Sequence, residues 1–125
     1  MVRPRILIVE DDTDLRRMFR TTLALAGFDV EEAGDGIEAL RLVDNRPPDL
    51  VVLDLILQTL DGVSVLQELA ARNATSEIPV VIVTGSQIDT DRLDVASVLH
   101  KPVMPDELVK TVERCLSRAV PVSHA

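Results

Sequence analysis

Polar side chains with the chemistry of a reaction site stand directly after runs of aliphatic residues. Each lies where a buried strand would end, and a charged group in that position needs a reason because charges are almost never buried without a partner. The residues concerned are Glu10, Asp11 and Asp12 after the first run, Asp54 after the third, Thr84 and Gly85 after the fourth, and Lys101 after the fifth. Carboxylates, a hydroxyl and an ammonium are groups that bind a metal ion or a phosphoryl group.

The elements that must position these groups alternate between short aliphatic runs and longer amphipathic segments. The runs predict five strands, at 5–9, 28–33, 50–53, 79–83 and 95–99. Helical periodicity or a helix-start signal predicts helices at 15–26, 37–45, 63–72 and from Pro105 onward, with Cys115 on the apolar side of the last. Between the fourth and fifth strands only 86–94 remain, which predicts a shortened or irregular fourth helix among five.

This alternation predicts the fold. Strands that are apolar on both faces indicate a parallel sheet covered by helices on each side. We therefore expect an α/β fold with a doubly wound five-stranded parallel sheet in the flavodoxin-like order 2-1-3-4-5. In such a sheet the carboxyl ends of strands one, three, four and five meet at one crevice, which brings the polar residues together.

The chemistry of that crevice follows from its charges. Carboxylates about 5 Å apart repel by roughly 3 kcal/mol per pair at an effective dielectric constant of about 20. Mg²⁺ suits one or two carboxylates together with waters and a phosphate, so it is the cofactor we expect. Asp54 then attacks a phosphoryl group and forms an acyl phosphate, while Thr84 and Lys101 donate to the phosphoryl oxygens.

These residues resemble the receiver domain of two-component response regulators over nearly the whole chain. The motifs are Ile6 to Asp12, Val51 to Asp54, Asp61-Gly62, Val83 to Gly85 and Lys101-Pro102. The resemblance implies that Asp54 is the phosphoacceptor, that Asp11 and the backbone carbonyl of Ile56 bind Mg²⁺ directly, and that Glu10 binds it through water. It also implies that Thr84, Gly85 and Lys101 form the phosphate-binding switch. The phosphate would come from a histidine kinase, a histidine phosphotransfer protein or a small phosphodonor.

The chain departs from the family at three points. Gln58 stands where a proline usually follows the acceptor, which predicts a differently shaped loop. Val98 stands where an aromatic residue usually switches rotamer, and a valine cannot swing in that way. The stretch between Thr84 and Lys101 is also short, so the surface for partners is expected to be atypical. The resemblance also implies that Ile56 and Ser86 are the positions that influence attack by water. An apolar Ile56 cannot orient a water molecule, which predicts slow self-dephosphorylation.

Composition limits the other function classes. A net charge of -8 with two Phe and no Trp or Tyr argues against direct nucleic-acid binding. No run approaches a membrane span, and the lone Cys115 fits a reducing compartment, so we expect a cytoplasmic protein. A phosphatase would need a second acid where Ile56 stands, so no enzyme beyond self-catalysed phosphotransfer is expected. We expect a receiver domain at 1–119 and a tail or linker start at 120–125, with a downstream protein partner and possible homodimerisation.

Alternative readings of single residues stay open at this point. Asp12 or Thr13 would cap the first helix, Asp61 with Gly62 would start the third, and Thr84 could be an ordinary strand-end threonine. His100 has no partner at metal-binding spacing and is interpreted as a surface residue. For the whole chain, the alternative is a degenerate receiver that binds partners without being phosphorylated.

Overall fold

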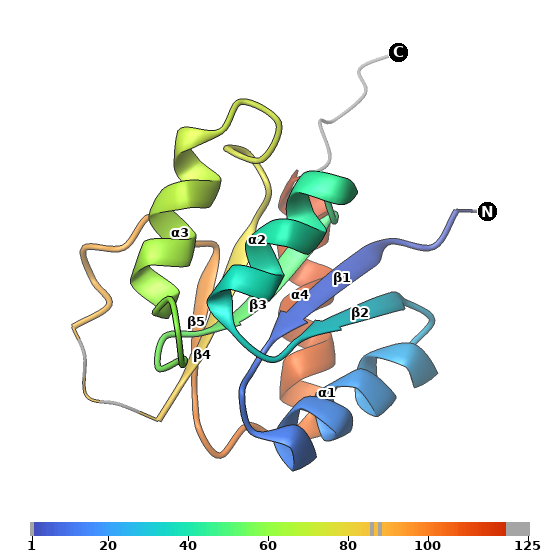
Figure 1. Ribbon diagram of the computed structural model, residues 1–125. Coiled ribbons are helices and arrows are strands. Elements are labelled where there is room, and N and C mark those ends of the chain that lie inside the picture. Colours follow the sequence, from blue (N-terminus) through green and yellow to red (C-terminus); the bar gives the residue numbers. More distant parts are fainter. Residues whose placement is uncertain (1, 86, 88, 120–125) are drawn as a thin grey trace.

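The computed structural model describes residues 2–85, 87 and 89–119, and it has the expected α/β architecture (Figure 1). The strands are β1 (Arg5–Val9), β2 (Asp29–Ala33), β3 (Leu50–Asp54), β4 (Val80–Thr84) and β5 (Ser97–His100). The helices are α1 (Thr13–Leu25), α2 (Gly36–Asn45), α3 (Gly62–Ala71) and α4 (Pro105–Ala119). The five strands are parallel and lie in the order β2-β1-β3-β4-β5, which confirms the predicted topology.

Helices cover both faces of the sheet, α1 and α4 on one side and α2 and α3 on the other (Figure 1). Successive strand residues explain this arrangement because their side chains point to opposite faces. In β1, Ile6 and Ile8 pack with Phe19 of α1, whereas Leu7 and Val9 belong to the core under α2 and α3. All of β3 and β4 is buried, as expected for central strands of a sheet covered on both faces.

The connection from β4 to β5 contains no helix over its described residues, 85, 87 and 89–96. Leu93 and Val95 there are half-buried against the core of the α2/α3 side, and turn hydrogen bonds join Leu93 N to Thr90 O and Val95 N to Leu93 O. The sequence predicts a shortened or irregular fourth helix in this connection, and its described residues are irregular and form no helix. The predicted fifth helix is α4, and Ser86 and the tail at 120–125 lie outside the described residues.

Three aspartates begin helices at the carboxyl edge of the sheet. The side chains of Asp12, Asp35 and Asp61 each accept a hydrogen bond from the backbone nitrogen three residues ahead, at 2.9, 2.8 and 2.8 Å. Such N-caps satisfy donors that have no partner within the helix. Asp12 and Asp61 therefore have the structural role that the sequence suggested. The carboxylates available for chemistry at this edge are those that cap nothing.

Candidate functional site

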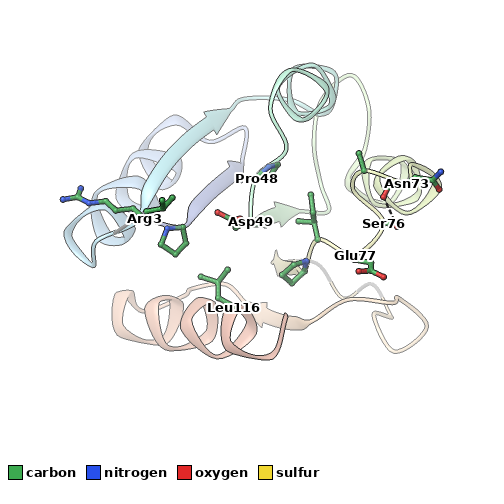
Figure 2. Close-up of a pocket in the computed structure, with 12 residues that line it drawn as sticks. Arg3, Pro48, Asp49, Asn73, Ser76, Glu77 and Leu116 are labelled. Atoms are coloured by element: carbon green, nitrogen blue, oxygen red, sulfur yellow. Dashed lines mark hydrogen bonds between the residues drawn. The ribbon is translucent and has the colours of Figure 1, made fainter. Parts of the chain in front are cut away.

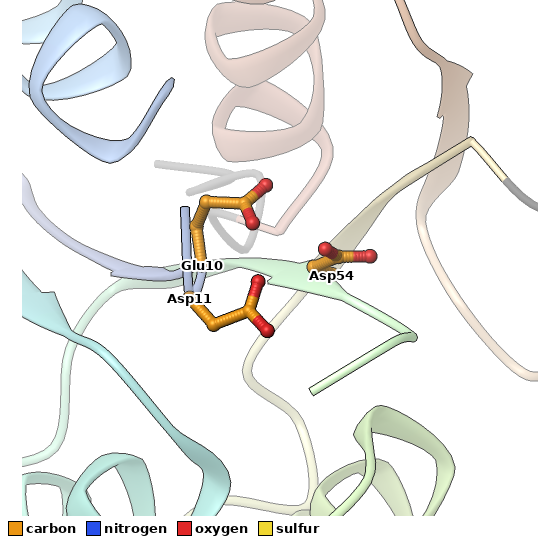
Figure 3. A group of neighbouring side chains, drawn as sticks. All are labelled: Glu10, Asp11 and Asp54. Atoms are coloured by element: carbon orange, nitrogen blue, oxygen red, sulfur yellow. The ribbon is translucent and has the colours of Figure 1, made fainter. Parts of the chain in front are cut away.

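The candidate site lies at the carboxyl ends of β1, β3 and β4. Figure 3 shows Glu10 and Asp11, which follow β1, beside Asp54, the last residue of β3. One oxygen from each lies within 4.8 Å of the others. Register explains the convergence, because Val9 pairs with Leu53 and each strand carries its acid at the next position.

Lys101 joins two of these carboxylates. Its Nζ lies 2.8 Å from Oε1 of Glu10 and 3.0 Å from Oδ2 of Asp54. Both acids are buried, with Glu10 only 1% exposed and Asp54 4%. The ammonium therefore serves as the counter-charge of a cluster that would otherwise hold three negative charges and no positive one.

Glu10 is the acid of the cluster whose ionised form is most clearly disfavoured by burial. Burial raises its pKa to about 7, because removal from water penalises the charged form; the contact with Lys101 lowers the pKa, and the charge of Asp54 raises it again. Oε2 accepts a hydrogen bond from Asp12 N at 3.2 Å, but Oε1 accepts none of good geometry among the described residues and has only the ion pair with Lys101. A cation bound nearby through water would give that oxygen a hydrogen-bond partner.

For Lys101, the contacts with the carboxylates outweigh the effect of burial on the pKa. Burial would lower its pKa, but the contacts with Glu10 and Asp54 outweigh burial, so the pKa of the ammonium lies above its usual value. The side chain is held at its base as well, since the backbone nitrogen of Lys101 donates to the carbonyl of Thr84 at 3.0 Å. The lysine is accordingly charged and fixed against β4.

The remaining predicted residues surround this cluster. Thr84 is fully buried at the end of β4, and Gly85 follows it on the surface beside the Lys101 side chain. Ile56 donates its backbone N–H to Oδ1 of Asp54 at 3.1 Å while its side chain is 55% exposed. A cavity of about 440 Å³ has Glu10, Asp11, Asp12, Asp54, Ile56, Gly85 and Lys101 in its lining.

Two predicted positions lie away from the cluster. Val98 of β5 pairs with Ile82 of β4 and is half-buried against the α2/α3 core. His100 is exposed at the end of the same strand, where the sequence expected a surface histidine. Neither side chain lines the cavity that contains the carboxylates.

Glycines that the sequence did not single out for the site shape the loop after Asp54. A Cβ on Gly62 would lie 2.3 Å from the carbonyl oxygen of Asp54, and one on Gly36 would lie 2.2 Å from that of Leu60. Real Cβ atoms do not approach so closely, so both positions require glycine. In the same loop, Thr59 has a φ of 67°, a left-handed conformation that is unfavourable for a β-branched residue. The loop bearing Ile56 is thus clamped by α2 and α3.

A cavity of about 640 Å³ lies at the other end of the sheet (Figure 2). Pro4, Asp49 and Pro79, which immediately precede β1, β3 and β4, line it together with Leu116 of α4. The carboxylate of Asp49 in this lining already accepts a hydrogen bond from Arg5 N at 2.7 Å. Ligands of open parallel sheets bind at the carboxyl ends of the strands, so the acidic cluster is the stronger candidate.

No helix within the described part of the chain is long and apolar enough to cross a membrane.

Comparisons with known proteins agree with this geometry. A family model described as the response regulator receiver domain matches residues 6–113. The response regulator MprA from Mycobacterium sp. (strain KMS) is 37% identical over 94% of this chain and 52% of its own length. The chain spans about half the length of the curated relatives it matches first.

Solved structures give the same picture. A sensor protein from Polaromonas sp. JS666 superposes with a TM-score of 0.87 at 30% identity, over 95% of this chain and 100% of the other. The chemotaxis response regulator CheY4 of Vibrio cholerae superposes with a TM-score of 0.85 at 25% identity, over 91% of this chain and 99% of the other.

Proposed function

This chain belongs to the response regulator receiver family, and we propose that it is a phosphoacceptor signalling domain, phosphorylated on Asp54 with the help of Mg²⁺. The observation that carries the proposal is the position of Lys101 between two buried carboxylates, Glu10 and Asp54, with Asp11 beside them. A cluster of this charge is costly to bury and has no structural use as a helix cap. Its groups are those that phosphoryl transfer to a carboxylate needs.

The donor set fits Mg²⁺. Three carboxylates with oxygens within 4.8 Å of one another, one of them with an oxygen lacking a hydrogen bond, match a hard cation that prefers oxygen ligands. Asp11, Asp54 and the backbone carbonyl of Ile56 would hold the ion directly, and Glu10 would hold it through water. When bound, the ion supplies positive charge that stabilises the transferring phosphoryl oxygens.

The carboxylate of Asp54 acts as the nucleophile. One of its oxygens forms a bond to phosphorus as the bond from phosphorus to the donor breaks, and the donor leaves with that electron pair. Phosphohistidine of a histidine kinase or histidine phosphotransfer protein is the donor we propose, and a small acyl phosphate would serve in its place. Ile56 N and Lys101 Nζ, which donate to opposite oxygens of Asp54, hold the carboxylate in a fixed orientation for attack.

The switch residues act on the product. Lys101 would donate to an oxygen of the new phosphoryl group, and Thr84 would donate its hydroxyl from the end of the neighbouring strand. Gly85 would give the phosphoryl group room beside Lys101, since its surface position carries no side chain. The chain would turn over only its own phosphate, so we propose a self-modifying switch instead of an enzyme with external substrates.

The phosphorylated state is proposed to be long-lived. The exposed side chain of Ile56 lines the cavity and has no polar atom with which to orient an attacking water molecule. Ser86, the other position expected to influence this rate, lies outside the described residues. Slow loss of phosphate suits a domain whose output is a change in partner binding.

The output is proposed to be a protein contact, with homodimerisation as one form of it and without direct binding of nucleic acid. Val98 cannot act as an aromatic switch, and the β4–β5 connection has an irregular described part, so the surface for partners would differ from that of ordinary receivers. We propose that residues 1–119 form the receiver, that 120–125 form a tail or linker start, and that the protein works in the cytoplasm. The lone buried Cys115 fits that reducing compartment.

Intact-mass measurement after incubation with acetyl phosphate and Mg²⁺ tests the proposal. The wild-type chain should gain one phosphoryl group, and Asp54→Asn should gain none. Asp12→Asn is the matched control, because asparagine also caps helices and Asp12 lines the same cavity without belonging to the proposed ligand set. If no donor phosphorylates the wild type and Mg²⁺ does not bind, the degenerate receiver becomes the better description.

A further inference from the structure

We propose that Arg16 of α1 is a positioning residue for the two acids that follow β1. It would act by fixing the peptide that joins Glu10 to Asp11. The inference rests on the proposed function only for the identity of the ion that those acids bind. The contact that motivates it is a hydrogen bond of 2.9 Å from Nη1 of Arg16 to the backbone carbonyl of Glu10.

That carbonyl is part of the peptide between the two acids. A peptide unit is planar and includes the Cα atoms on both sides, so holding its oxygen restricts the direction from which both side chains leave the backbone. The other side of Glu10 is also fixed, because its nitrogen donates to the carbonyl of Ala33 at 3.1 Å. Figure 3 shows both carboxylates on consecutive residues directly after β1.

Arg16 is itself held in place. Its Nε lies 3.5 Å from Oε1 of Glu32 in β2, and its side chain is only 20% exposed. Its Nη1 also lies 3.4 Å from the point where a Cβ on Gly34 would stand, so the turn after β2 leaves just enough room for the guanidinium. The planar, rigid guanidinium can contact a carboxylate and a carbonyl at once. Arg16 therefore ties the loop after β1 to the end of β2.

Charge and position make opposite predictions for this residue. If Arg16 acted only as a nearby positive charge, its removal would strengthen binding of a cation to the acids, because like charges repel. If Arg16 acts by position, its removal frees the peptide and weakens binding. Partners behind the ligands of a metal commonly change its affinity by about 10-fold to 100-fold when they are lost.

The test compares Arg16→Met and Arg16→Lys with the matched control Arg17→Met. Arg17 is the exposed neighbour on the same helix turn, so its replacement removes the same charge without touching the loop. The variants should fold, because Glu32 keeps a second ion pair with Arg20 at 3.6 Å. Two measurements are made: calorimetric titration with MgCl₂, and the amide chemical shift of Asp11 in metal-free protein.

Arg16→Met should bind Mg²⁺ about 10-fold more weakly than wild type, Arg16→Lys should fall between them, and Arg17→Met should bind as wild type does. The Asp11 amide, which belongs to the peptide in question, should shift in Arg16→Met and stay unchanged in Arg17→Met. Mg²⁺ binding by Arg16→Met that equals or exceeds that of wild type overturns the inference. If Arg16→Met does not fold, the inference is overturned when Arg16→Lys binds Mg²⁺ with wild-type affinity. If the wild type binds no Mg²⁺, the proposed function fails, while the Asp11 shift still decides the role of Arg16.

Discussion

Replacing Glu10 with glutamine removes one charge from the acidic cluster and keeps the size and shape of the side chain. The charges around Glu10 nearly cancel. Carboxylate oxygens of Asp11 and Asp54 within 4.8 Å each repel it by about 3 kcal/mol, and Lys101 at 2.8 Å attracts it by about 6 kcal/mol, at an effective dielectric constant of about 20. Because these contributions offset one another, burial decides the balance, and it favours the protonated carboxyl.

The sign of the pH dependence follows from the pKa of Glu10. In the folded chain that pKa is about 7, and the ordinary value of 4.5 applies when the chain is unfolded. Between these values the folded state binds a proton that the unfolded state has released, so the free energy of unfolding falls as pH rises. The stabilisation is complete below about pH 4.5 and is lost above about pH 7, and a shift of this size corresponds to about 3 kcal/mol. Glutamine cannot ionise and should abolish this component.

Urea unfolding followed by circular dichroism measures the effect, since the chain has no Trp or Tyr for fluorescence. In EDTA, the free energy of unfolding of wild type relative to Glu10→Gln should fall by about 2.5 kcal/mol from about pH 5 to about pH 8. Saturating MgCl₂ at the higher pH should restore most of the loss in wild type and should stabilise the variant less. Glu113→Gln, an exposed glutamate on α4, is the matched control and should follow wild type. A wild-type-minus-variant difference that does not change with pH would refute the reasoning.

Three other substitutions have definite expected outcomes. Lys101→Met should destabilise the metal-free protein by about 2 kcal/mol in urea unfolding, less than for a fully buried pair, whereas Lys110→Met, exposed on α4, should have little effect. Gly36→Ala should lower the free energy of unfolding by about 2 kcal/mol and weaken Mg²⁺ binding in calorimetry, because the new Cβ would push against the carbonyl of Leu60. Unchanged binding would contradict the proposal that the loop bearing Ile56 helps to hold the ion. Ile56→Asn should shorten the lifetime of the acyl phosphate about 10-fold, as followed by mass measurement over time, because asparagine can orient a water molecule. An unchanged lifetime would contradict the claim that the side chain at position 56 controls attack by water.

Much of the fold was predictable because central parallel strands are apolar on both faces and therefore stand out in the sequence. Strand ends were less certain. The sequence placed Asp54 and Thr84 just after their strands, but the parallel ladders continue through both residues. The fourth strand begins at Val80, one residue after the predicted start at Pro79, which has no N–H to donate. The acids still met as expected, since all parallel strands end at the same edge.

The contacts that hold the site together were not predictable in the same way. Arg16 lies on a helix, and its spacing from the acids gives no sign that it reaches back to the carbonyl of Glu10. Gly62 resembled an ordinary helix-start residue. Its close approach to Asp54, like that of Gly36 to Leu60, appears only when α2 and α3 pack against the loop. Such contacts depend on how elements pack in three dimensions, which periodicity does not encode.

The choice of lysine at position 101 also follows from the packing. The chain has eleven arginines and two lysines, yet the residue inside the acidic cluster is a lysine. An ammonium is compact and has three donors arranged around one nitrogen, so Lys101 can contact Glu10 at 2.8 Å and Asp54 at 3.0 Å and still direct a donor toward a phosphoryl oxygen. The planar guanidinium of arginine presents its donors in one plane and would suit one carboxylate at a time. The resting cluster and the proposed phosphorylated site thus require the same small, three-donor charge.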